Sequence, residues 1–152
     1  ISRLGNFDEN KVLSAIAYGE GIPGRAERIL NDEKLNLLRN CIIDLLTDID
    51  SRSNNIVLNY EKRLDSFKDS KEEVLNILES LIRDIIVYKE LQDKKMIMNV
   101  DKLEDIDRFS SNKSYKKLSA MLEKIREARI NIRNNANYSM VISVMLMGLS
   151  EG

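Results

Sequence analysis

The segment "SKEEVLNILESLIRDIIVYK", Ser70 to Lys89, has a broad helical pattern of apolar residues. Ser70 and Glu73 have the Ser-x-x-Glu spacing of a capping box, which predicts where this helix begins. An apolar face this wide predicts contact with more than one neighbouring element. Its positions are Val74, Ile77, Leu78, Leu81, Ile85 and Tyr88, with Leu75, Ile82 and Ile86 beside them.

Arg83 and Asp84 interrupt this apolar helix. At 100° per residue, Arg83 falls near the centre of the polar face and Asp84 at its edge. Glu79 and Arg83 are also an i, i+4 pair in the favoured order, and such pairs stabilise a helix by about 0.2–0.5 kcal/mol. The spacing alone therefore favours an ordinary surface ion pair for Arg83.

Helical spacing recurs on both sides of this segment, and no segment shows the sustained alternation of a strand. The sequence therefore predicts an all-α fold. "DKLEDIDRF" from Asp101 is typical of a short capped helix. The other apolar positions are Leu35, Leu38, Ile42, Leu45, Leu46 and Ile49 after "NDEK"; Val57, Tyr60, Leu64 and Phe67 in residues 56–67; and Tyr115, Leu118, Leu122, Ile125 and Ile132 in residues 113–134, a stripe that Arg129 shares.

The last helical segment, "YSMVISVMLMGL", is apolar on every side. Such a helix is either surrounded by other helices or packed against a partner. Three asparagines precede it, and Asn137 is expected to be its N-cap because its side-chain oxygen can accept an otherwise unpaired backbone N–H. About 20 apolar residues are needed to cross a bilayer, so this segment is too short to span one.

Near the N-terminus, "YGEGIPGRAERIL" combines three glycines with the single proline of the chain. A helix over residues 8–18 is predicted to end at these glycines, and Pro23 suits the first position of the next helix. Arg25 lies one turn in, where a cation opposes the helix dipole. It is either a chance surface residue or faces an anion such as a nucleotide phosphate.

Composition narrows the function classes. Twenty-four Lys and Arg residues nearly balance 25 Asp and Glu residues, which disfavours nucleic-acid binding through bulk charge. The absence of His and of a P-loop motif argues against common catalytic, metal and nucleotide sites, and the single cysteine, Cys41, suits a core position. We therefore expect a non-enzymatic, cytoplasmic chain without a cofactor, metal or membrane segment. Because it begins at Ile1, we also expect it to be part of a longer protein.

The order of these features resembles a known family. "GEGIPGRAERIL", "LIRDIIVYK", "IMNVD" and "NNANYSMVISVMLMGL" are similar, in this order, to the C-terminal region of the delta-prime subunit of the bacterial DNA polymerase III clamp loader, of the low-GC Gram-positive type. The resemblance implies two helices from the end of an AAA+ lid in residues 1–31. It implies a collar domain, a bundle of about five to six helices, in residues 32–152.

The resemblance also implies a function and site residues. The chain would be a non-catalytic scaffold that contacts the other clamp-loader subunits, gamma/tau and delta, and reaches DNA only through the complex. Arg25 would occupy the sensor-2 position, and Pro23 and Gly24 would form the start of its helix. Arg83 with Asp84 would match the Arg-Asp pair of the family, and Asn137 the asparagine before its last helix. From the residues alone, a free-standing helical adaptor that binds a peptide or helix in a groove stays open.

Overall fold

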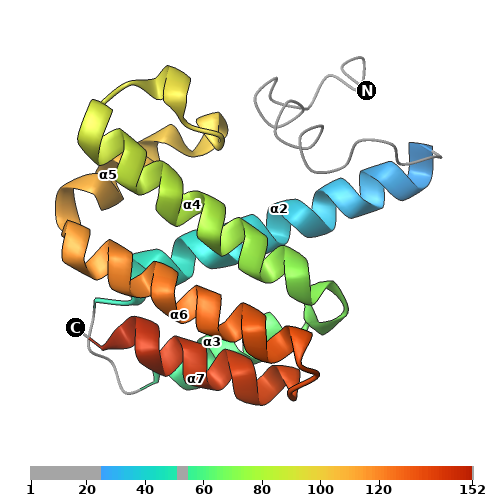
Figure 1. Ribbon diagram of the computed structural model, residues 1–152. Coiled ribbons are helices and arrows are strands. Elements are labelled where there is room, and N and C mark those ends of the chain that lie inside the picture. Colours follow the sequence, from blue (N-terminus) through green and yellow to red (C-terminus); the bar gives the residue numbers. More distant parts are fainter. Residues whose placement is uncertain (1–24, 51–54, 152) are drawn as a thin grey trace.

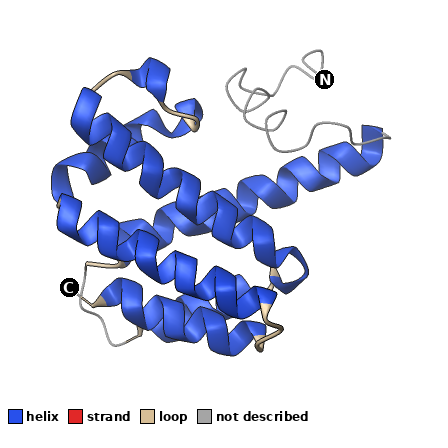
Figure 2. Cartoon of the chain, in the orientation of Figure 1, coloured by secondary structure: helices blue, strands red, loops and turns tan. Residues whose placement is uncertain are grey.

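The computed structural model describes the backbone of residues 25–50 and 55–151 and the side chains from residue 33 onward. Six α-helices and three short 3-10 helices form this part, with loops between them and no strand (Figure 2). The predicted all-α fold is thereby confirmed. The elements are α2 (Arg25–Asp48), α3 (Ile56–Asp65), η2 (Lys68–Ser70), α4 (Lys71–Leu91), η3 (Lys94–Met96), η4 (Val100–Lys102), α5 (Leu103–Asn112), α6 (Tyr115–Arg133) and α7 (Tyr138–Ser150).

Helix α4 lies at the centre of the bundle (Figure 1). It packs against α5 and α6 most extensively and against α2 as well. Its predicted apolar positions are buried, apart from Ile86 and Tyr88, which are half-buried. The width of its apolar face therefore predicted correctly that α4 contacts several neighbours.

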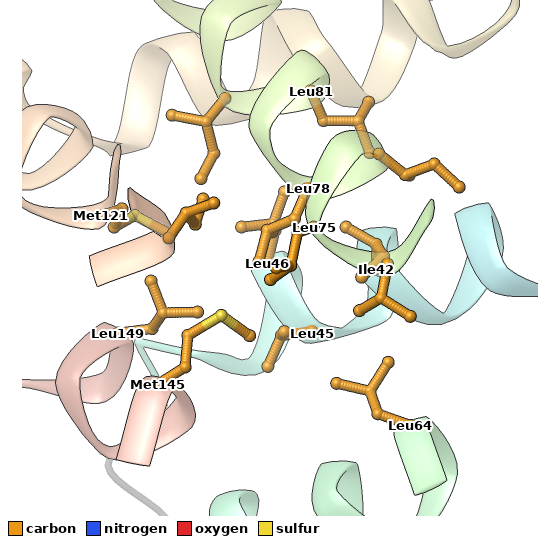
Figure 3. Close-up of a cluster of buried hydrophobic side chains, with 14 of the residues drawn as sticks. Ile42, Leu45, Leu46, Leu64, Leu75, Leu78, Leu81, Met121, Met145 and Leu149 are labelled. Atoms are coloured by element: carbon orange, nitrogen blue, oxygen red, sulfur yellow. The ribbon is translucent and has the colours of Figure 1, made fainter. Parts of the chain in front are cut away.

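One continuous apolar core fills the space between the helices. Figure 3 shows Leu45 and Leu46 of α2, Leu78 of α4 and Met145 of α7 converging at its centre. The predicted stripe of α2 is buried except for the half-buried Leu35, and Cys41 is buried among these side chains as expected. Burial raises the pKa of the Cys41 thiol, so the thiol is an unreactive part of the core.

Helix α2 is continuous from Arg25 to Asp48, so Arg25 and the apolar stripe after "NDEK" belong to one helix. Residues 31–34 are Asn, Asp, Glu and Lys. They include neither proline nor glycine, so each of them costs at most about 0.7 kcal/mol inside a helix. The predicted domain boundary after residue 31 thus falls within one helix. The helix predicted over residues 8–18 lies outside the described residues.

Of two predicted helix starts, one is confirmed and one is wrong. Helix α4 begins at Lys71 with Ser70 as its N-cap residue, as predicted, but the Ser70 side chain makes no capping bond. The Ser70 N–H donates to the Phe67 carbonyl, because the residue also closes the 3-10 turn η2. Helix α5 begins at Leu103 rather than at Asp101, whose carboxylate is bound by Arg39. In both places a backbone turn precedes the helix and replaces the predicted side-chain cap.

The buried face of α6 is rotated slightly from the predicted one. Tyr115 is exposed, whereas Met121 and Ala128 are buried. Arg129 is on the α4 side of the helix, where its guanidinium donates to Glu72 Oε2 at 3.1 Å and to Asn76 Oδ1 at 2.7 Å. Arg129 therefore joins α6 to α4 through hydrogen bonds at the margin of the core.

Helix α7 packs on α6 and α3. Asn137 is its N-cap, as predicted, and Asn137 Oδ1 accepts from Met140 N at 3.1 Å. The next residue, Tyr138, donates its buried hydroxyl to the Leu64 carbonyl at 2.7 Å. These two bonds fix the start of α7 and attach it to the end of α3. In the described part of the chain, none of the helices is long and apolar enough to cross a membrane.

The capping bond gives a stability prediction. Asn137→Ala removes the acceptor for Met140 N, and we expect the free energy of unfolding to fall by about 1 kcal/mol. Asn137→Asp keeps an acceptor oxygen and is expected to stay within about 0.5 kcal/mol of the unmodified chain. Urea unfolding followed by circular dichroism measures both, and equal stability of the Ala variant would contradict the capping role.

Candidate functional site

Asp84 holds the loop between α4 and α5 against the bundle. Its carboxylate accepts from Met98 N at 2.9 Å, from Asn99 N at 2.8 Å and from Asn99 Nδ2 at 2.7 Å. The residue is only 3% exposed, although the helical angle places it at the edge of the polar face of α4. The loop that it binds also covers it. Asp84 is therefore a structural anchor for residues 98 and 99.

A buried ion pair fixes the same loop to α2. Arg39 NH1 donates to Asp101 Oδ2 at 2.8 Å, and Arg39 NH2 donates to Asp101 Oδ1 at 2.6 Å. This two-bond geometry is the strongest arrangement of arginine and carboxylate. Both side chains are buried, so each depends on the other to offset the loss of hydration.

Asn99 joins the two interactions into one network. Its Oδ1 accepts from Arg39 NH2 at 3.1 Å, while its Nδ2 donates to Asp84 and lies 3.4 Å from Ser80 Oγ. We call Arg39, Asp84, Asn99 and Asp101 the buried polar network. It connects α2, α4 and the α4–α5 loop, and α2 is far in sequence from the other two segments.

Arg83 takes no part in this network. Its side chain is 66% exposed, and its guanidinium lies 3.7 Å from Glu79 Oε2. This is the i, i+4 surface pair that the spacing predicted, and such exposed pairs contribute little to stability. The two members of the "RD" pair therefore have different roles: Asp84 is a buried anchor, and Arg83 is a surface residue.

The outer side of α7 is apolar and exposed. Met140, Val144 and Met147 are 67%, 59% and 52% exposed, and their i, i+4, i+7 spacing places them on one stripe. We call these three residues the α7 stripe. No residue of α7 is charged. Among the described residues, no helix covers this stripe, so α7 is not surrounded there. The alternative, in which α7 packs against a partner, stays a prediction.

Three other predicted site residues cannot be placed. Pro23 and Gly24 lie outside the described residues, and Arg25 is described only as the first residue of α2. Within the part that the structure describes, no group of three or more Cys, Asp or Glu residues could hold a metal ion. The site that the described residues build is therefore the buried polar network together with the exposed surfaces around it.

The sequence did not reveal Arg39, Asn99 or Asp101 as members of the network. Arg39 and Asn40 interrupt the apolar residues between Leu38 and Cys41, and this interruption is the local signal that the sequence offers for a buried charge. For Asp101 the sequence predicts a capping role, because an acidic residue before a helix usually has one. "IMNVD" is recognisable as a motif, but a motif does not show which helix it contacts.

The contrast between Asp84 and Arg83 is testable with adjacent substitutions. Asp84→Ala leaves the N–H groups of residues 98 and 99 and the Asn99 amide without their acceptor, and we expect a loss of about 3 kcal/mol in the free energy of unfolding. Arg83→Ala is the matched control, with an expected change within about 0.5 kcal/mol.

Urea unfolding of both variants measures the difference. If Asp84→Ala does not fold, Asp84→Asn, which keeps one acceptor oxygen, is expected to lose about 1–2 kcal/mol. Equal losses for the two neighbouring positions would contradict the anchoring role.

One comparison with known proteins identifies the family of this chain. A family model described as "DNA polymerase III, delta subunit, C terminal" matches residues 33–151, which include most of α2 and all of the elements that follow it. No curated protein and no solved structure gives a significant match. The matched region contains the buried polar network and the α7 stripe. The chain therefore belongs to the family of C-terminal domains of the DNA polymerase III delta subunit, which are clamp-loader-related domains.

Proposed function

We propose that this chain is a scaffold domain that holds a subunit in the assembled clamp loader of DNA replication, by packing against the corresponding domains of neighbouring subunits. The observation that carries the proposal is the α7 stripe, three large apolar side chains left exposed on a helix without charges. Contiguous apolar surface of this kind is typical of protein interaction sites. The family match supports neighbouring loader subunits as the partners.

The geometry of α7 suits this role. Its inner face, from Tyr138 to Leu149, is buried against α6 and α3, and its first turn is fixed by the Asn137 cap. The stripe is therefore presented by a helix with a fixed position, so little conformational entropy is lost when a partner covers it. Binding would bury methionine and valine side chains and gain about 25 cal/mol for each Å² of apolar surface removed from water.

The proposal extends to the type of subunit. The family description names the delta subunit, whereas the order of the sequence motifs resembles the delta-prime subunit of the low-GC Gram-positive type. We assign the chain to delta-prime on the basis of that motif order. On this assignment gamma/tau and delta are its neighbours, and DNA is reached only through the complex.

The assignment also divides the chain into parts of two domains. Residues 1–31 would end an AAA+ lid in which Arg25 occupies the sensor-2 position, and residues 32–152 would form the collar. We propose no catalytic residue and no cofactor for the chain. The nucleotide-linked work would belong to AAA+ modules of the DNA polymerase III complex, in the cytoplasm of a bacterium.

The α7 stripe provides the test. The chain is mixed with the other loader subunits and analysed by size-exclusion chromatography, with light scattering to determine the mass of each species. We expect co-elution as a larger species. Met140→Glu with Val144→Glu is expected to weaken association at least about 100-fold, because two charges would have to be buried at the interface.

Leu37→Glu is the matched control, since Leu37 is equally exposed but lies on α2. It is expected to leave association unchanged. Separate elution of the unmodified chain at micromolar concentrations would contradict the scaffold function and favour a free-standing adaptor. Equal effects of the α7 and α2 substitutions would contradict the assignment of the interface to α7.

A further inference from the structure

We propose a second docking surface on this domain, at the α4–α5 loop, that binds a protein segment with apolar side chains flanked by acidic residues. The surface consists of Leu91, Lys94, Lys95, Met96 and Met98. It is separate from the α7 stripe, because this loop and α7 lie on opposite sides of the bundle (Figure 1). The inference therefore does not depend on the proposed function.

The apolar part of this surface comes from alternation along the loop. Ile97 is extended and only 6% exposed, whereas Met96 and Met98 on either side of it are 57% and 62% exposed. Leu91, the last residue of α4, is also mostly exposed. One inward side chain thus fixes the segment to the core, and two flexible thioether side chains point outward. Methionine is frequent on surfaces that bind peptides and helices, because its side chain adapts to the shape of the partner.

Hydrogen bonds and an ion pair fix the α4–α5 loop at several points. Asp84 accepts from the backbone N–H groups of Met98 and Asn99, and Asp93 Oδ1 accepts from Lys95 N at 2.9 Å. The buried Arg39–Asp101 pair fixes its far end. Burying an ion pair has a large desolvation cost, and an apolar pair of similar shape often stabilises a fold at least as well. Stability alone therefore does not explain the Arg39–Asp101 pair. A loop that the pair holds in one conformation loses less entropy when it binds a partner.

The charges around the loop indicate the chemistry of the partner. Lys94 and Lys95 are exposed, and neither forms an ion pair with a carboxylate of the described part of the chain. The nearest carboxylates in sequence form other hydrogen bonds: Glu90 accepts from Tyr115, and Asp93 accepts from Lys95 N. Both carboxylates keep their charge, but neither forms an ion pair with Lys94 or Lys95. Two lysines beside two methionines complement a segment in which acidic residues flank apolar ones.

The test uses two fluorescent peptides with the same leucine stripe on a helical pattern. One peptide carries glutamates beside the stripe and the other carries lysines at the same positions. Fluorescence anisotropy with the full chain measures both affinities. We expect the glutamate peptide to bind at least about tenfold more tightly than the lysine peptide, and we expect the difference to shrink as salt is added.

Variants locate the binding site. Met96→Ser with Met98→Ser is expected to weaken binding of the glutamate peptide at least about tenfold. Lys94→Glu with Lys95→Glu is expected to reverse the preference, so that the lysine peptide binds more tightly. All four side chains are exposed, so thermal unfolding should be unchanged.

The controls are Leu37→Ser on α2 and Leu58→Ser on α3, both equally exposed and both expected to leave peptide binding unchanged. The proposal is overturned if neither peptide binds, if the two peptides bind equally, or if either control substitution weakens binding as much as the loop substitutions. Association with the loader subunits is measured separately, so failure here is distinguishable from failure of the scaffold function.

Discussion

The burial of α4 on several sides is the constraint on which the rest of the structure depends. A helix with so wide an apolar face cannot be covered by one neighbour, so α2, α5 and α6 must all contact it. Helices α3 and α7 pack against each other and reach the same core through Leu64 and Met145 (Figure 3). Helix α7 is thereby left at the margin, where no helix of the described chain covers its outer stripe.

The buried charge of this central helix is Asp84, and it organises the opposite side of the bundle. A buried carboxylate requires hydrogen-bond donors, and Asp84 finds them in the backbone of residues 98 and 99 and in the Asn99 amide. Asn99 in turn accepts from Arg39, which binds Asp101. The domain therefore has two proposed docking surfaces, each on an element that the core holds in place. One is the apolar stripe of α7, and the other is the α4–α5 loop with its methionines and lysines.

Periodicity predicted the class of the fold and the buried faces of α2 and α4 well, because both depend on spacing within one helix. Capping bonds were less predictable. Helix α4 does begin after Ser70, but neither Ser70 nor Asp101 caps a helix with its side chain: Ser70 closes a 3-10 turn, and Asp101 is bound by a distant arginine. Asn137 was predicted correctly because capping is a local interaction.

The candidate site was predictable only in part, for the same physical reason. Arg83 and Asp84 are adjacent in sequence, and the helical angle placed Arg83 correctly on the surface. The burial of Asp84 depends on residues 98 and 99, which no pattern within α4 reveals. Arg39 finds its partner 62 positions away in the sequence. Likewise, the apolar segment 138–149 predicted either burial or a partner, and only the packing of α6 and α3 shows which residues remain open.

The most direct test of the account is a structure of the assembled clamp loader that contains this chain, determined by electron cryomicroscopy. The account predicts that Met140, Val144 and Met147 are covered by a helix of a neighbouring subunit, while α4 keeps the same neighbours as in the isolated chain. An assembled loader in which these three side chains remain exposed to solvent would contradict it.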